Sequence, residues 1–132
     1  MGKLSRKTRQ KRLLQNEAEK FTTFFRAEEL FHSARKKDKG IGMATVYRFL
    51  NDSRRKNLIH AYSCENRMLF SVSNKTHCHF KCQECGLVSS IRLDSVDFIQ
   101  RKIRGSVCHF QLEIEGICED CIGTSQQRRA QD

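Results

Sequence analysis

The stretch THCHFKCQECG, residues 76–86, places two histidines and three cysteines within eleven residues. A second C-x2-C pair follows near the C-terminus. The four paired cysteines, separated as C-x2-C-x32-C-x2-C, are Cys82, Cys85, Cys118 and Cys121. Each pair lets two thiolates reach one ion from a tight turn, and two such turns complete a tetrahedron. Gly86 follows the first pair, where the turn needs a permissive backbone. The spacing predicts one structural Zn2+ per subunit, held by four sulfurs.

Thiol redox chemistry is the alternative explanation of a C-x-x-C motif. Two pairs in one small module favour zinc instead. The chain has seven cysteines, an odd number, which is unlike a small secreted disulfide scaffold. The basic N-terminus has no apolar stretch behind it, and no run of about 18 apolar residues occurs. We therefore expect a cytoplasmic protein without a membrane partner.

The opening stretch also contains His77, Cys78 and His79. In a strand the two histidines face one side and the cysteine the other, so the imidazoles could form part of a second site for Zn2+, Fe2+ or Mn2+. The alternative is a pair of histidines lining a surface strand. Two ligands do not complete a site, and the sequence candidates for the others are His32, His60, Cys64, His109, Glu113 and Glu115.

The remaining cysteines have less specific surroundings. Cys108 alternates with the apolar Phe110 and Leu112, and we expect it to be a small core residue. Cys64 lies in a predicted turn, where an exposed, inert thiol is expected, although a ligand or redox role stays open.

The positive charge is confined to one half of the chain. The net charge is +10, and residues 1–60 contain 16 Lys and Arg against 6 Asp and Glu, whereas residues 61–132 contain 9 of each. The cysteines are distributed the other way, with none before Cys64. This division predicts two modules, a basic one that meets a polyanion and a neutral one built around cysteine.

The hydrophobic pattern of the first half predicts helices over 9–21, over 27–37 and from Met43, with Gly42 as the last helix's N-cap. Two short strands, 58–63 and 68–73, follow with a turn at CENR. Helix, helix, turn, helix and hairpin is the order of a winged helix, whose recognition helix enters the DNA major groove. A three-helix domain without a DNA role is the alternative, and the charge weighs against it.

Candidate DNA contacts lie on two segments of this half. The basic segment 1–12 is expected to be an arm that grips phosphates or enters a minor groove through Arg6, Lys7, Arg9, Lys11 and Arg12. Thr45, Tyr47 and Arg48 lie near the start of the third helix, outside its apolar face. An arginine there can pair with guanine, and a tyrosine can contact a thymine methyl group or a phosphate.

The second half predicts a strand over 77–82, a strand over 87–92, a helix over 94–104 and a strand over 106–115. Asp94 or Ser95 would cap that helix. The fold class is therefore α+β, with a winged-helix domain over 1–73, a hinge at 74–76, a small zinc-containing α/β domain over 77–123 and a flexible tail over 124–132. No nucleophile-base constellation or phosphate loop is present, so no enzyme and no small-molecule substrate is expected.

The sequence resembles the ferric uptake regulator family of bacterial metal-dependent transcription regulators. The matching motifs, in the family's order, are RKTRQKR, FRAEELF, GMATVYRFL, HCHFKCQECG and the pattern L-E-I-x-G-x-C-x-x-C. The resemblance implies a homodimer, formed through the C-terminal domain, that binds palindromic double-stranded operator DNA. It also implies repression of uptake or stress genes when a regulatory metal site at the hinge is filled, with His77 and His79 in that site.

Departures from the family's pattern concern this regulatory site. Phe24 and Ser90 stand where the family's iron and peroxide sensors commonly have a histidine and an acid, and Phe110 stands where the family often has a histidine. His60 resembles a ligand position of the zinc uptake regulators, and Glu65 is a candidate acid in the wing. The candidate regulatory ligands are His60, His77 and His79, with Cys64, Glu65 or Cys78.

Imidazole-rich ligation slightly favours Zn2+ over Fe2+ as the second, exchangeable ion. The main hypothesis is thus a metal-responsive DNA-binding repressor. The alternatives are a DNA-binding regulator whose only metal is structural zinc, and a thiol redox protein.

Overall fold

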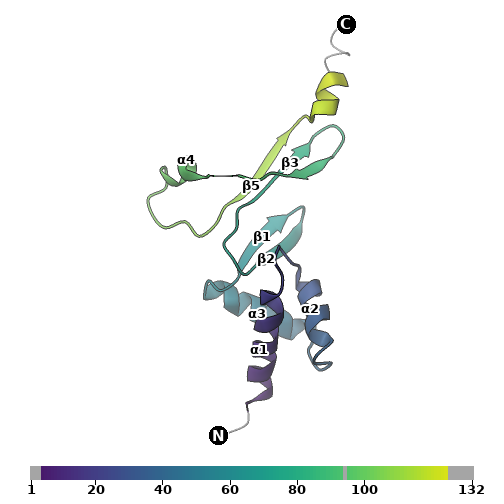
Figure 1. Cartoon of the computed structure of the whole chain (residues 1–132), viewed down its shortest axis with the longest axis vertical. Coiled ribbons are helices and arrows are strands. Elements are labelled where there is room, and N and C mark those ends of the chain that lie inside the picture. Colours follow the sequence, from purple (N-terminus) through teal and green to yellow (C-terminus); the bar gives the residue numbers. More distant parts are fainter. Residues whose placement is uncertain (1–3, 94, 125–132) are drawn as a thin grey trace. The chain divides into compact units, whose positions relative to one another are not determined.

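The computed structural model describes residues 4–93 and 95–124. The chain divides into two compact units, Met1–Lys75 and Thr76–Asp132, each considered by itself below (Figure 1). No helix among the described residues is long and apolar enough to cross a membrane. The predicted cap Asp94 and the predicted tail after residue 124 lie outside the described residues.

The first helix, α1 (Arg6–Glu19), begins earlier than the sequence indicated. The backbone N–H of Thr8 donates to the Oγ of Ser5 at 3.1 Å, which caps the helix, and the Arg, Lys, Gln and Leu residues that follow favour helix. The expectation of an arm reaching residue 12 is therefore wrong. Arg6, Arg9 and Arg12 project from a helix instead of an extended segment.

Two further helices, α2 (Ala27–Arg35) and α3 (Met43–Arg55), complete the helical part. Gly42 is the N-cap of α3, as predicted. The core between the helices contains Leu14, Leu30 and Val46, none of which is exposed. Burying such side chains contributes about 1.5–3 kcal/mol each, which holds α3 on the other two helices.

The wing is a hairpin of β1 (His60–Cys64) and β2 (Arg67–Ser71), paired antiparallel. Its two turn residues, Glu65 and Asn66, have φ angles of 49° and 64°. Backbone hydrogen bonds between Phe25 and Phe70, at 2.8 and 2.9 Å, attach the hairpin to the segment before α2. The first unit is thus a winged helix, as the order of elements predicted.

The second unit contains a three-stranded sheet in the order β4-β3-β5 (Figure 1). The strand β3 (His77–Cys82) pairs antiparallel with β4 (Val88–Ser90) and parallel with β5 (Gln111–Gly116). The short helix α4 (Asp97–Gln100) lies between β4 and β5 in sequence. Together the two units form the α+β fold that the sequence predicted.

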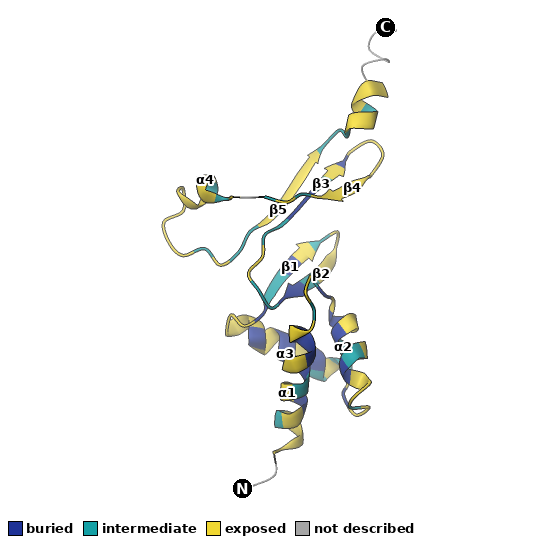
Figure 2. Ribbon diagram, viewed as in Figure 1, coloured by how far each residue is buried: buried dark blue, intermediate teal, exposed yellow. Residues whose placement is uncertain are grey.

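Four details of this unit differ from the sequence-based expectation. The helix covers four residues rather than 94–104, and β5 begins at Gln111 rather than at 106. Cys108 consequently precedes the strand and is exposed, so its predicted core position is wrong. The apolar residues that alternate along β5 were expected to form a buried face, but Ile114 is 43% exposed in the single subunit. Figure 2 shows how little of this unit is buried.

Candidate metal centre and nucleic-acid interface

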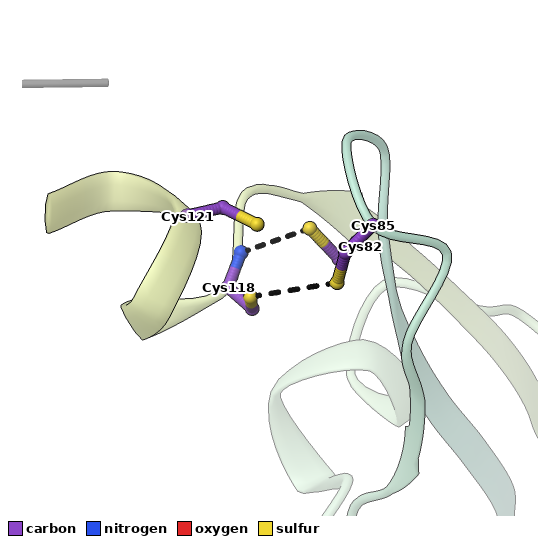
Figure 3. A group of neighbouring side chains, drawn as sticks. All are labelled: Cys82, Cys85, Cys118 and Cys121. Atoms are coloured by element: carbon purple, nitrogen blue, oxygen red, sulfur yellow. Dashed lines mark hydrogen bonds between the residues drawn. The ribbon is translucent and has the colours of Figure 1, made fainter. Parts of the chain in front are cut away.

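The four paired cysteines converge at one end of the second unit (Figure 3). Cys82 is the last residue of β3, and Cys85 lies in the turn that leads to β4. Cys118 and Cys121 come after β5, where residues 119–124 are helical. Their sulfurs all lie within 4.8 Å of one another. The turn closes at Gly86, whose φ of 76° is a conformation that residues with a Cβ rarely adopt.

The sulfur spacing fits a tetrahedral ion. The Sγ atoms of Cys85 and Cys118 are 3.8 Å apart. Zn–S bonds of about 2.3 Å in a regular tetrahedron separate two sulfurs by about 3.8 Å. The backbone N–H of Cys118 also donates to the Sγ of Cys82 at 3.3 Å, which orients that sulfur. The donor set of four soft thiols suits zinc.

The four thiols have unequal tendencies to ionise. Backbone N–H groups of Cys85 and then Cys118 point at Cys82 and lower the pKa of its thiol to about 6. The neighbouring thiol of Cys118, together with burial, raises the pKa of Cys121. Several thiolates can therefore share this space only when a cation offsets their mutual repulsion.

The histidines of β3 lie together, as the strand alternation predicted. The ring centroids of His77 and His79 are 5.3 Å apart. His79 is buried, and its Nε2 lies 3.2 Å from the Oε1 of Glu113 on β5, the residue opposite it in the parallel register. Burial, followed by the neighbouring His79, lowers the pKa of His77. A neutral imidazole is the form that binds a metal.

Glu113 therefore lies next to the histidine pair, whereas the sequence favoured other residues as partners of these histidines. The signal that brings it there is the parallel pairing of β3 with β5, which spacing along the chain does not reveal. Cys78 is buried on the alternate face of β3, away from the pair. His60 and Cys64 lie on β1, and Glu65 lies in the wing turn, so all three belong to the first unit.

The exposed side of α3 carries the predicted DNA-contacting residues. Tyr47 is 45% exposed while Phe49 is buried, which confirms that the two occupy different faces. The guanidinium of Arg48 donates to the carbonyl of Ala44 and to the Oγ1 of Thr45, both at 3.4 Å. These bonds hold Arg48 along its own helix, where an approaching base or phosphate can displace them.

A groove of about 390 Å³ runs between α1 and α3. Its lining includes Arg6, Lys7 and Lys11 from α1 and Thr45 and Arg48 from α3. Lys56 lies so close to Lys11 that it lowers the pKa of that amine. The groove therefore brings Arg6 together with Thr45 and Arg48, and it crowds positive charge beside the recognition helix.

Arg9 and Arg12 do not line this groove, although the sequence placed them in one set with Arg6. Both are exposed on α1. The helical period explains the division, because Arg6 and Gln10 share a face that Arg9 and Arg12 do not. The tertiary structure thus joins Lys7 and Lys11, rather than Arg9 and Arg12, to the cations beside α3.

A winged helix followed by a small sheet with four converging thiols is typical of one class of protein, the DNA-binding regulators that also bind metal. The sequence profile of the ferric uptake regulator family matches residues 3–115. The chain therefore belongs to the ferric uptake regulator family, whose members are metal-responsive transcription regulators and not enzymes. This membership agrees with the predicted cytoplasmic location and removes the thiol redox enzyme from consideration.

Three similar proteins illustrate the range of the family. The chain is 32% identical over 96 residues to the ferric uptake regulation protein of Staphylococcus epidermidis, a match that spans 68% of this chain and 70% of that protein. It is 28% identical over 102 residues to the peroxide operon regulator of Bacillus subtilis, spanning 72% and 69%. The ferric uptake regulator of Helicobacter pylori, described as having three functional metal-binding sites, superposes with a TM-score of 0.61 at 22% identity, covering 86% of this chain and 82% of that one. The relatives include iron and peroxide regulators, so they assign no subgroup.

Proposed function

We propose that this protein is a dimeric, sequence-specific DNA-binding repressor of metal-uptake or stress genes, with one structural Zn2+ per subunit and a second, exchangeable metal that controls DNA binding. The convergence of four thiols from two C-x-x-C turns, in a chain that begins with a winged helix, is the observation that carries the proposal. We take the first unit as the DNA-binding domain and the second as the dimerisation domain.

DNA binding is supported by the charge and exposure of the first unit. The residues that would contact DNA are Arg6, Arg9, Arg12, Thr45, Tyr47 and Arg48. Of these, Arg6, Thr45 and Arg48 meet at the groove beside α3. An exposed arginine on a recognition helix can form a bidentate pair with guanine, whereas the cations of α1 would neutralise phosphates.

The structural zinc would be held by Cys82, Cys85, Cys118 and Cys121. Because these residues come from segments more than 30 positions apart, the ion would cross-link β3, its turn and the end of β5. A closed four-sulfur site contributes to folding and offers no open position for chemistry. We therefore assign it a structural role.

The exchangeable metal would bind His77 and His79, with Glu113 as a third ligand from the same unit. Zn2+ and Fe2+ are both compatible with two imidazoles and a carboxylate. His60, Cys64 and Glu65 stay predictions for the remaining positions, whereas Cys78, on the other face of β3, does not face the histidine pair. Which ion is sensed decides the physiological signal, and we expect zinc slightly ahead of iron.

Dimerisation is supported by the exposed apolar side chains of the second unit. Among the described residues of that unit, only Cys78, His79 and Cys82 are buried. Its large exposed apolar residues are Leu87, Val88, Phe98, Ile103, Ile114 and Ile122. So small a core leaves a unit of this size marginal, and pairing with a second copy would bury the exposed surface.

Metal analysis combined with DNA binding tests the proposal. Metal per protomer is measured by elemental analysis before and after mild chelation, and binding to labelled duplex DNA is followed on the same samples. We expect one zinc to survive chelation while a second metal is lost, with DNA binding falling and returning when metal is restored. The double variant His77→Ala/His79→Ala should keep the first ion and lose the response, whereas Lys81→Ala on the same strand should behave like the parent.

A regulator with structural zinc alone is the second candidate, favoured by the departures at Phe24 and Ser90. In that case only one tightly held zinc is found, and the histidine variant binds DNA like the parent. If DNA binding does return on adding metal, the ion that restores it best identifies the metal that is sensed.

A further inference from the structure

A second cationic groove lies on the other flank of α3. It has a volume of about 560 Å³ and is bounded by the start of α2, by α3 and by the wing strand β2. Three arginines from these three elements line it: Arg26, Arg54 and Arg67. None of the three was among the DNA contacts expected from the sequence. We call this feature the wing-side groove.

The positive charge of the wing-side groove is only partly offset by acidic residues. Within residues 4–93 and 95–124, no carboxylate lies within ion-pair distance of any of its three arginines. The neighbouring Arg55, by contrast, pairs with Asp52 at 2.7 Å. Glu28 is the one acid in the lining. Three guanidinium groups that have no carboxylate partner can together attract an anion from outside the chain.

The other lining residues suit a sugar-phosphate chain rather than an isolated ion. Tyr47 and Met68 are 45% and 46% exposed, so each presents an apolar surface that a deoxyribose can contact. Asn51 and Asn66 add side-chain amides that can donate to phosphate oxygens. The groove therefore offers both apolar surface and hydrogen-bond donors, which a sugar-phosphate chain can use together.

The helical positions explain why α3 has a groove on each side. Thr45, Phe49 and Asp52 line the groove towards α1, whereas Tyr47, Asn51 and Arg54 line the wing-side groove. At 100° per residue, these two sets are centred roughly 160° apart around the helix. A helix in the B-DNA major groove has one phosphate backbone on each side.

We propose that the wing-side groove binds one of the two phosphate backbones that border the major groove occupied by α3, through Arg26, Arg54 and Arg67. The opposite backbone then meets Lys7 and Lys11 in the groove towards α1. This inference rests on the proposed DNA-binding function and deepens it, because it assigns a second strand contact. The arginines add affinity that does not depend on base sequence and set the orientation of α3.

Salt dependence provides the test, because it counts phosphate contacts. The probe is a fluorescently labelled duplex of mixed sequence, and binding to the full chain is followed by anisotropy between 50 and 200 mM NaCl. Each phosphate contact contributes about 0.9 to the slope of log K against log salt. The variant Arg54→Gln/Arg67→Gln should lower that slope by about 1.8 for each DNA-binding domain engaged. Its loss of affinity across this salt range should then be about twelvefold smaller than that of the parent for each DNA-binding domain engaged.

Two matched variants distinguish a phosphate contact in the groove from a general effect of the protein's net charge. Arg101→Gln/Arg104→Gln removes the same charge from exposed positions of the second unit and should keep the parent's slope. Arg54→Lys/Arg67→Lys keeps the charge in the groove and should retain most of the slope. Thermal unfolding should be unchanged in every variant, since all the altered side chains are exposed.

An unchanged slope in Arg54→Gln/Arg67→Gln, or an equal decrease in the second-unit control, would overturn the wing-side assignment while leaving DNA binding itself intact. If the parent protein loaded with metal binds no duplex at any salt concentration, the proposed function fails and this inference fails with it.

Discussion

Glu17 offers the sharpest test of what holds the DNA-binding unit together. Its side chain on α1 is 3% exposed, and its carboxylate accepts from Lys37 at 2.6 Å, from Ser33 at 2.6 Å and from Lys20 at 2.9 Å. The bond from Lys37, then those from Ser33 and Lys20, lower the pKa of Glu17 from its ordinary 4.5 to about 2, although burial opposes them. The carboxylate thus connects α1 to α2 and to the segment after α2.

This depressed pKa translates into stability. A difference of about 2.5 in pKa, at about 1.4 kcal/mol per unit, corresponds to about 3 kcal/mol. Because the folded pKa lies below the unfolded one, the contribution is complete above about pH 4.5 and is lost as the pH falls towards 2. At pH 3 roughly 1.5 kcal/mol of it remains.

We expect Glu17→Gln to lower the free energy of unfolding of the first unit by about 2–3 kcal/mol at pH 7, and by about half of that at pH 3. Urea unfolding followed by tyrosine fluorescence measures it, because both tyrosines of the chain, Tyr47 and Tyr62, lie in the first unit. The signal is therefore independent of zinc loss from the second unit at low pH.

Glu19→Gln is the matched control, since Glu19 lies on the same helix and is exposed. It should change the free energy of unfolding by no more than about 0.5 kcal/mol. Equal stabilities of the two variants at pH 7, or a gap between Glu17→Gln and the parent that does not shrink at pH 3, would refute the reasoning.

Three further outcomes are expected. Leu30→Ala, at a fully buried position, should destabilise the first unit by about 2–5 kcal/mol in the same urea assay. Gly86→Ala should cost about 1–2 kcal/mol through its φ of 76°, because no atom stands in the way of the added Cβ. A chelator competition should therefore show roughly tenfold or greater weakening of zinc affinity, and an unchanged affinity would contradict it. Complete zinc removal should unfold the second unit, seen as loss of its amide-exchange protection, while the tyrosine signal of the first unit persists.

Much of the fold follows from local patterns in the chain. The C-x2-C spacing, the Gly42 cap and the apolar stripe through Val46 and Leu50 each depend on near neighbours, and the structure has the elements that they predict. The exposed position of Tyr47 followed from its distance to Phe49 along one helix. The start of α1 does not follow from the charge of residues 1–12, because basic residues occur in extended arms and in helices alike; the local signal for it is Ser5, a good N-cap.

The second unit was harder to predict because its contacts are not local. The register of β3 with β5 pairs His79 with Glu113 across 34 positions, and spacing along the chain does not encode it. The alternation around Cys108 suggested a strand with a buried face. One subunit offers too little apolar surface to cover that segment, and it is exposed.

Residue types and their spacing are enough to predict which kinds of site this chain can form: four thiols suited to a closed ion, a histidine pair suited to a second one, and a basic first half suited to DNA. Each of these predictions depends on residue type and spacing, because a metal or a polyanion can be bound only by side chains of suitable chemistry at suitable positions. Which cations gather on either side of α3 depends on the packing in three dimensions, which places Lys7 and Lys11 on one flank and Arg54 and Arg67 on the other. Packing of three helices and a hairpin sets that grouping, because it brings together faces of elements that are distant in the chain.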